Sequence, residues 1–270
     1  MLEQFAAIAV EAGEVILDVY GRADLGARAK ADGSTVTEAD AAAEAVILER
    51  LAEHWPDIPV IAEEAVSAGQ IPEVGHQFFL VDPLDGTAEF VRHSGEFTVN
   101  IALVEDGAPV AGLVYLPTTG EIFRGDGHGA ARAVRLDGAL SPWEAIRARP
   151  APEAGLTVIA SRRSGGDRLA AYLDRFVVAE TIRASSSLKL CRLAQGAADL
   201  YPRFGRTMAW DIAAGHAVLR AAGGEVWTLD GRPLSYEPGR VPGEDAFANP
   251  DFVASGAFDP CDLVRNGGAS

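Results

Sequence analysis

The stretch LVDPLDGTAEF holds two aspartates whose spacing and setting suit the binding of a divalent cation. Asp82 is predicted to end an apolar strand, and Pro83 should stop the hydrogen-bond ladder there. Asp85 follows at the expected start of a helix, so the two carboxylates can converge on one point. Oxygen ligands of this kind suit Mg²⁺, which keeps further positions for water and phosphate oxygens. Gly86 and Thr87 add backbone N–H groups at a helix start, where a phosphate can bind.

The same stretch has other interpretations. Asp85-Gly86 is a common turn sequence, and Asp82 is a common type of helix cap. The run LDGT also resembles the nucleophile loop of haloacid-dehalogenase-type phosphatases, which reads DxDGT after a strand. The nucleophile of that loop lies two residues before the second Asp, and this chain has Pro83 there. A covalent aspartyl route is therefore disfavoured.

Two further acidic motifs stand at predicted element ends. Glu63 and Glu64 follow the apolar run PVIA, and Asp211 opens an apolar helix directly after Trp210. A solvated turn is the simpler explanation of the first pair, and an N-cap is the simpler explanation of Asp211. However, acids brought this close repel each other, and a bound divalent cation relieves that repulsion. The motifs together predict a shared metal site.

Thr37 and Asp40 have the spacing of a capping box at the start of a predicted helix. Capping is the simpler interpretation of the pair. The functional alternative pairs Asp40 with a hydroxyl such as that of Thr87, so that the two side chains orient a water molecule.

The elements that position these residues are predicted from hydrophobic periodicity. The first half has two amphipathic helices, then apolar strand runs that include a hairpin around Glu105-Asp106-Gly107. The second half alternates strands with helices, which indicates a layered α/β protein. A Pro-, Ala- and Arg-rich segment, residues 137–154, is the best candidate for a connection between an N-terminal and a C-terminal region. We expect residues 1–150 to carry the metal-binding motifs and residues 151–270 to complete the site. The predicted helices are residues 2–20, 38–54, 165–176, 186–197 and 209–224, and the predicted strands are residues 59–62, 78–82, 98–117, 120–130, 156–161, 176–183, 198–204 and 225–231.

The composition excludes several classes of protein. Of 270 residues, 48% are apolar and 23% are charged, which is ordinary for a globular protein and rules out a disordered chain. The net charge of −16 argues against binding to nucleic acid or anionic lipid, because such a surface repels both. Two cysteines, Cys191 and Cys261, are too few for a disulfide framework. With no signal-peptide pattern and no apolar run of membrane-spanning length, we expect a cytoplasmic protein; peripheral association with the inner membrane stays open.

Taken together, the motifs resemble the inositol monophosphatase family of Mg²⁺-dependent, lithium-sensitive phosphatases. That family shows Glu-Glu after a strand, then DPxDGT, then a distal WD before a helix rich in Gly and Ala. Within the family, the chain looks most like the CysQ branch of 3′(2′),5′-bisphosphate nucleotidases. The supporting stretches run over nearly the whole chain: KADGS, VTEAD, FFLVDPLDGTAEFV, GEFTVNIALVEDGAPVAGLVYLP, SSLK, ADLYPRFGRTMAWDIAAGHAVL and NPDF. The resemblance implies an α/β (α+β) fold, a layered αβαβα sandwich.

The resemblance also implies ligands for two Mg²⁺ ions and a weaker third. The ligands are Glu63, Asp82 and the Leu84 carbonyl for the first ion, and Asp82, Asp85 and Asp211 for the second. Glu64 and outer waters would serve the third.

The same resemblance assigns catalytic and substrate-binding roles. Thr87, held by Asp40, would help deprotonate the attacking water, with Glu63 also at the catalytic centre. The residues implied to contact the substrate are Gly86 and Thr87 for the phosphate, and Ser186, Ser187, Lys189 and Asp211 for the remainder.

The implied substrate is a small phosphate ester, adenosine 3′,5′-bisphosphate, which is hydrolysed to AMP and phosphate. Two stretches depart from the branch: Ala88 stands where Lys is frequent, and Ser161-Arg162-Arg163-Ser164 lacks a His. The alternatives are an inositol or sugar phosphate as substrate, or a non-catalytic metal-binding homologue. The oligomeric state, including a homodimer, stays open.

Overall fold

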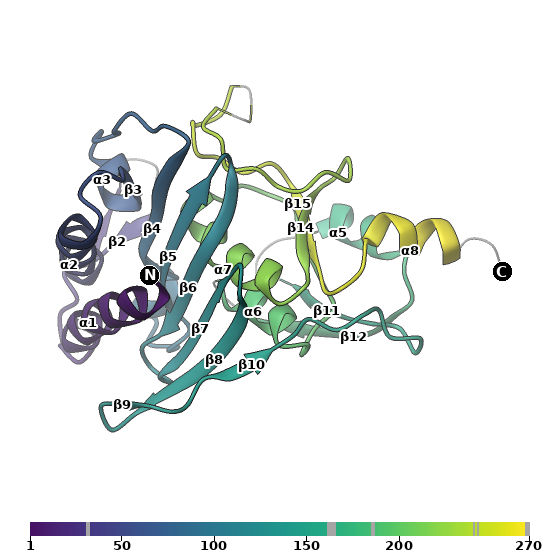
Figure 1. The fold of residues 1–270 in the computed structure, drawn as a ribbon, viewed down its shortest axis with the longest axis horizontal. Helices are drawn as coiled ribbons and strands as arrows, with labels where there is room; N and C mark the ends of the chain where they lie inside the picture. Colours follow the sequence, from purple (N-terminus) through teal and green to yellow (C-terminus); the bar gives the residue numbers. More distant parts are fainter. Residues whose placement is uncertain (31–32, 161–165, 185–186, 240, 242, 268–270) are drawn as a thin grey trace.

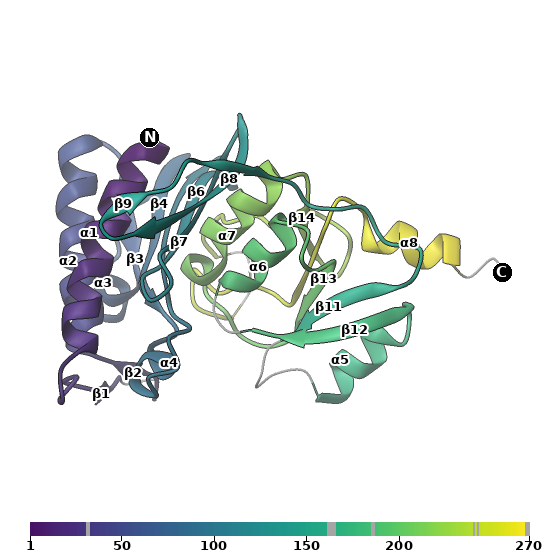
Figure 2. The same cartoon turned by 90° about the horizontal axis from the view of Figure 1, so that it is seen from below.

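The computed structural model describes residues 1–30, 33–160, 166–184, 187–239, 241 and 243–267. Its helices and sheets stack in five layers, α–β–α–β–α (Figure 1). Helices α1 (Leu2–Tyr20) and α2 (Glu38–His54) cover one face of the first sheet. The order of the layers is also seen when the molecule is turned by 90° (Figure 2). The α/β sandwich expected from the sequence is therefore confirmed.

Both outer helices form for reasons that the sequence makes clear. In α1, buried residues such as Phe5, Ile8 and Ile16 recur at helical spacing and face the sheet. Helix α2 begins at a capping box, in which the Thr37 hydroxyl accepts a hydrogen bond from the Ala39 N–H. The predicted bounds of both helices are confirmed.

Within the described ranges, eight strands form the first sheet, and seven of them follow the order β10-β8-β7-β6-β5-β4-β3, with β9 beside β8. Strand β3 is parallel to β4, and the remaining neighbours are antiparallel. A separate two-stranded ribbon, β1 (Arg28–Ala29) and β2 (Thr35–Val36), precedes α2. The sheet strands are β3 (Val60–Ala62), β4 (Gln77–Asp85), β5 (Thr98–Glu105), β6 (Ala108–Leu116), β7 (Glu121–Asp126), β8 (Gly129–Leu136), β9 (Ala139–Leu140) and β10 (Glu144–Ile146). Two short helices, α3 (Glu63–Ser67) and α4 (Thr87–Val91), follow β3 and β4.

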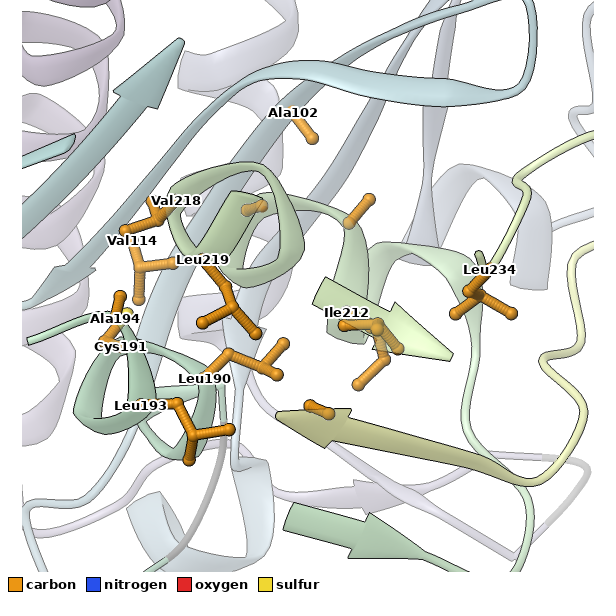
Figure 3. Packing of buried hydrophobic residues seen from close by; sticks show 14 of the residues in the cluster. Ala102, Val114, Leu190, Cys191, Leu193, Ala194, Ile212, Val218, Leu219 and Leu234 are labelled. Carbon is orange, nitrogen blue, oxygen red and sulfur yellow. The ribbon is translucent and has the colours of Figure 1, made fainter. Parts of the chain in front are cut away.

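The middle layer consists of α6 (Leu188–Ala194) and α7 (Ala209–Ala221), which pack against each other and against the first sheet. Figure 3 shows Leu190, Ile212 and Leu219 from these helices in one apolar cluster. Helix α7 lies close to β6 because Gly112 has no side chain: a Cβ there would lie 2.4 Å from the Ala214 carbonyl oxygen. The N-terminus of α7 is thereby fixed relative to the first sheet.

The second sheet has the strand order β12-β11-β13-β15-β14. Its strands are β11 (Leu156–Ala160), β12 (Val178–Arg183), β13 (Leu200–Arg203), β14 (Glu225–Thr228) and β15 (Phe252–Ser255). Helices α5 (Gly166–Leu173) and α8 (Pro260–Gly267) lie on its outer face (Figures 1 and 2). Among the helices described, none is both long and apolar enough to cross a membrane.

Three predictions about the elements were wrong in whole or in part. Strand β4 does not end at Asp82 but continues to Asp85, because a bulge lifts Pro83 out of the ladder without ending the pairing with β5. Residues 137–154 begin with β9 and β10, which extend the first sheet, and continue from there to β11 of the second sheet. The predicted connection is therefore confirmed only for its second half, after Ile146. Strand β2 lies within residues 30–40, which the sequence predicted to be a loop, and that prediction was wrong there because β2 pairs with β1. Strands β1 and β15 and helix α8 had no prediction, because they are short or weakly periodic.

Candidate active site

The bulge in β4 brings two carboxylates to the same side of the first sheet. Asp82 pairs with Asn100, and Asp85 pairs with Thr98, so three steps along β4 match two steps along β5. Residues three apart in a regular strand point to opposite faces, and the extra residue cancels that alternation. The Leu84 N–H donates to Asp82 Oδ1 at 3.0 Å, which fixes the turn of the bulge.

The adjacent parallel strand supplies a second acidic pair. Strand β3 ends at Ala62, and Glu63 and Glu64 form the first turn of α3. The Lys30 ammonium donates to Glu63 Oε1 and to Glu64 Oε1, both at 2.7 Å. Both glutamates therefore already have a protein cation beside them. Lys30 belongs to the stretch KADGS, and its role was not predicted because nothing in the sequence alone connects it to Glu63.

The sequence left two alternatives for Asp40, a capping contact with Thr37 and a contact with the Thr87 hydroxyl, and the structure shows both. Its Oδ2 accepts from the Thr37 N–H at 2.7 Å and from the Thr37 hydroxyl at 2.6 Å, which caps α2. Its Oδ1 lies 3.0 Å from Thr87 Oγ1, which is also 3.3 Å from the Leu84 carbonyl oxygen. One carboxylate therefore caps a helix and orients the hydroxyl of the DGT motif.

Asp211 enters the site from the middle layer. It is not the N-cap of α7, as the structural alternative supposed: Met208 is the N-cap, and Asp211 is the third helical residue. Its Oδ2 accepts from the Met208 N–H at 2.8 Å. Asn249, whose Nδ2 donates to the Met208 carbonyl at 2.6 Å, holds this turn from the other side. The motif NPDF therefore positions the start of α7.

Ser187 has a different set of contacts from the one expected. Its N–H and its hydroxyl lie 2.7 and 3.0 Å from Asp85 Oδ2, and the residue is only 3% exposed. The hydroxyl also accepts from Asn100 Nδ2 at 2.9 Å and contacts the Asp211 carbonyl. Ser187 therefore holds Asp85 in place, and a contact between Ser187 and substrate stays a prediction. Ser186, and the stretch Ser161-Arg162-Arg163-Ser164, lie outside the described residues.

Lys189 lies nearby in α6 and is buried. Burial lowers the pKa of its ammonium to about 8, although Asp85, Glu89 and Asp211 pull it back toward its ordinary value. Its Nζ lies 5.3 Å from the centroid of the Tyr201 ring. A contact between Lys189 and substrate stays a prediction.

The acidic side chains raise one another's pKa. Burial, and then repulsion from Glu63 and Asp85, raises the pKa of Asp82 well above its ordinary value. Asp211 has a raised pKa for the same reasons, burial first and then Asp85 and Glu63. Burial likewise raises the pKa of Glu64 to about 7, against the opposing effect of Lys30. Glu63, Glu64, Asp82, Asp85 and Asp211 thus form an acidic cluster, in which negative charge is energetically costly unless a cation compensates it.

The donor types suit a hard divalent cation, although among the described residues no three of these acidic side chains are grouped closely enough to hold one ion. Carboxylate oxygens are the ligands that Mg²⁺ prefers, and carboxylates from separate elements influence one another here. Asn100, paired with Asp82, has a buried Oδ1 with no hydrogen-bond partner among the described residues. A hydrated cation would satisfy that oxygen. A cavity of about 540 Å³ borders Glu63 and Asp211, with Trp210 and Phe247 among its other lining residues.

Comparison with known proteins bears on the identity of this site. A model described as the inositol monophosphatase family matches residues 1–254. The chain belongs to the inositol monophosphatase family. It is 42% identical over 253 residues to the 3′(2′),5′-bisphosphate nucleotidase CysQ of Salmonella typhimurium, a match that covers 93% of this chain and 98% of that protein. The protein of the same description from Escherichia coli (strain K12) is 40% identical over 256 residues, 94% of this chain and 99% of that one.

Solved structures of the inositol monophosphatase family agree with this fold. CysQ from Bacteroides thetaiotaomicron superposes with a TM-score of 0.74 at 34% identity, over 93% of this chain and 95% of that one. An IMPase from Thermotoga maritima superposes with a TM-score of 0.74 at 25% identity, over 98% and 95%. The family resemblance of the motifs is therefore confirmed, and this family of phosphatases is metal-dependent.

Proposed function

We propose that this protein is a Mg²⁺-dependent 3′(2′),5′-bisphosphate nucleotidase that hydrolyses the 3′-phosphate of adenosine 3′,5′-bisphosphate to AMP and phosphate. The observation that carries the proposal is full-length identity of 40–42% to nucleotidases of that description. The carboxylates that raise the pKa of Asp82 and Asp211 support it, because phosphoryl transfer needs positioning and charge compensation more than covalent chemistry. Inositol or sugar phosphates, and a non-catalytic role, are the less favoured alternatives.

The proposed metal ligands are the residues of the acidic cluster. They are Glu63, Asp82, the Leu84 carbonyl, Asp85 and Asp211 for two ions, with Glu64 toward a third. Bound Mg²⁺ supplies Lewis acidity, which lowers the pKa of water and offsets charge on the phosphate oxygens. The protein's own contribution is to hold these ligands at fixed places through Ser187 and the bulge in β4.

Asp40 and Thr87 would move the proton of the attacking water. The Thr87 hydroxyl donates to Asp40 Oδ1, so its lone pairs are left to accept a hydrogen bond from water. When the water attacks phosphorus in line, its proton passes to Thr87 Oγ1 while the Thr87 proton passes to Asp40. The bond between phosphorus and the 3′ oxygen breaks, and that oxygen takes a proton from a solvent water to give the 3′-hydroxyl of AMP. Burial raises the pKa of Asp40, which makes its carboxylate a better proton acceptor. Gly86 and Thr87 backbone N–H groups are the proposed contacts to the phosphate.

The net charge of −16 is compatible with an anionic substrate under this proposal. Five of the acidic residues are in the cluster itself: Glu63, Glu64, Asp82, Asp85 and Asp211. Two or three Mg²⁺ ions would bring about +4 to +6 there and invert the local field. Without the metal, the same carboxylates should repel a phosphate ester, so substrate binding should depend steeply on Mg²⁺.

One assay tests the proposal. Phosphate release is measured with Mg²⁺ from adenosine 3′,5′-bisphosphate, inositol 1-phosphate and fructose 1,6-bisphosphate, with and without Li⁺. We expect the nucleotide to have the highest kcat/KM and Li⁺ to inhibit its hydrolysis. A tenfold preference for inositol phosphate, about 1.4 kcal/mol in favour of that substrate, would overturn the substrate assignment. Release from none of the three would favour the non-catalytic alternative.

A further inference from the structure

Helix α2 carries a second buried carboxylate, one helical turn after Asp40. Glu44 is only 5% exposed and lies on the apolar face of α2 with Ala43, Ile47 and Leu51. Burial raises the pKa of its carboxyl group, so its charge is costly at this place. An apolar residue would suit that face better for packing. The charge therefore calls for a specific explanation.

The explanation lies in the partners of Glu44. Its Oε2 accepts from the Glu64 N–H and its Oε1 from the Ala65 N–H, both at 2.8 Å. These two N–H groups belong to the first turn of α3, where a helix has N–H groups without partners of their own. The N-cap residue Ala62 makes no side-chain cap. Glu44 thus supplies, from another helix, the cap that α3 lacks.

The first turn of α3 also contains the residues proposed to bind metal. Glu63 is the first residue of α3 and Glu64 the second, so the backbone held by Glu44 carries both side chains. A five-residue helix has little stability of its own, and an external anchor determines where its first turn lies. Without that anchor, Lys30 would still form ion pairs with the two glutamates, but the backbone that carries them would no longer be held in one position.

We propose that Glu44 is a positioning residue that fixes Glu63 and Glu64 for Mg²⁺ and so sets the metal affinity. The inference rests on the proposed metal site. Asp40 and Glu44 lie four residues apart on α2, so the same helix that holds Thr87 also holds α3. Glu44 touches neither substrate nor reacting atoms, and its effect should therefore appear in metal binding before it appears in the chemical step.

The test measures Mg²⁺ affinity directly, by isothermal titration calorimetry on metal-free full-length protein. The variant is Glu44→Gln, which keeps the shape but turns one acceptor oxygen into a donor that faces an N–H group. The control is Glu49→Gln, the same loss of charge at an exposed position of α2. Changes in residues that orient metal ligands typically cost about 10–100-fold in metal affinity. We expect about a tenfold or greater loss for Glu44→Gln and less than twofold for Glu49→Gln.

A second readout separates positioning from mere loss of stability. At saturating Mg²⁺, Glu44→Gln should recover kcat to within about threefold of the wild type, with the Mg²⁺ concentration for half-maximal rate shifted as in calorimetry. If Glu44→Gln does not fold, Glu44→Asp keeps the charge, and its shorter side chain cannot reach both N–H groups. It should lose affinity in the same direction. In the wild type, hydrogen exchange at the Glu64 and Ala65 amides should slow when Mg²⁺ is added.

The outcomes distinguish this inference from the proposed function. A wild type that binds Mg²⁺ and a folded Glu44→Gln that binds it within twofold as tightly would overturn the positioning role alone. Fast exchange at the Glu64 and Ala65 amides that Mg²⁺ does not change would do the same. A wild type that does not bind Mg²⁺ at all would overturn the metal site and, with it, the role of Glu44.

Discussion

Replacing Asp40 by Asn should separate the two tasks that its carboxylate performs. The Oδ2 atom accepts two hydrogen bonds from Thr37, at 2.7 and 2.6 Å, whereas Oδ1 accepts from the Thr87 hydroxyl at 3.0 Å. An asparagine has one acceptor oxygen, and the side with two donors should take it. The amide NH₂ then faces Thr87, so this hydrogen bond reverses: the hydroxyl accepts from the amide, and its own proton turns toward the Leu84 carbonyl oxygen at 3.3 Å or toward the water. Thr87 then has no carboxylate to which it can pass its proton.

The magnitude follows from this reversal. Positioned proton transfer contributes about 10²–10⁴-fold in rate, or about 2.7–5.4 kcal/mol of barrier. Asp40→Asn should therefore lower kcat by about that factor, with the substrate KM changed by less than threefold. Stability should change by only about 1 kcal/mol, because removing a charge whose pKa burial has raised compensates for weaker hydrogen bonds. The assay is phosphate release at saturating Mg²⁺ and substrate, with thermal unfolding in parallel.

Thr37→Val is the matched control. It removes the capping hydroxyl, including its hydrogen bond to Asp40 Oδ2 at 2.6 Å, but keeps the Thr37 N–H that binds the same oxygen. It should cost about 0.5–2 kcal/mol of stability and leave kcat within threefold of the wild type. The reasoning is refuted if Asp40→Asn keeps kcat within threefold, or if Thr37→Val lowers kcat as much as Asp40→Asn does.

Three further predictions concern the acidic cluster. Asp82→Asn removes the ligand proposed to be shared by both ions and should lower kcat at least about 100-fold even at saturating Mg²⁺; near-normal turnover in the phosphate assay contradicts the assignment. Ser187→Ala removes the hydroxyl contact to Asp85 at 3.0 Å and leaves the N–H contact at 2.7 Å. Calorimetry should show a roughly tenfold loss of Mg²⁺ affinity in this variant. An unchanged affinity would mean that Asp85 does not need the Ser187 hydroxyl to hold its position. Burial raises the pKa of Glu64 from 4.5 to about 7, so its protonation stabilises the metal-free fold below pH 4.5 and this contribution is lost as the pH rises through about 7. Because Mg²⁺ binds the ionised carboxylates, the rise in Tm that Mg²⁺ causes should be larger at about pH 8 than at about pH 5.5. An equal rise in Tm at both pH values would count against the acidic cluster as the binding site.

The elements were predictable where periodicity or capping is strong. The apolar stripe of α1 and the capping box at Thr37 determined both outer helices, and the Glu105-Asp106-Gly107 turn placed the hairpin β5–β6. Strand β4 was not predictable beyond Asp82, because Pro83 ordinarily ends a ladder and only the pairing with β5 reveals the bulge. The division of the chain at residue 150 and the cytoplasmic location stay predictions.

The sequence predicted the acidic residues of the site but not the residues that hold them in position. Acidic motifs at strand and helix ends pointed to the cluster, because carboxylates that meet without a cation are costly. The supporting roles of Ser187 and Asn249 could not be assigned, since their partners lie far along the chain. Glu44 did leave a signal: an acid on the same face as Ala43, Ile47 and Leu51 contradicts the apolar pattern of that face. A charged residue on an otherwise apolar helix face thus indicates that its side chain makes specific buried hydrogen bonds.

Because of the bulge in β4, the site depends on the number of residues between Asp82 and Asp85 as well as on the identity of the two aspartates. Deleting either Pro83 or Leu84 would remove the extra residue, so that two regular steps on each strand would join the pair Asp82–Asn100 to the pair Asp85–Thr98. The two carboxylates would stay on one face, but the local turn would be lost, and with it the hydrogen bond from the Leu84 N–H to Asp82 and the place of the Leu84 carbonyl beside Thr87. Substitutions at Pro83 should therefore be tolerated far better than any insertion or deletion between the two aspartates. Homologous sequences should therefore keep the spacing of the two aspartates.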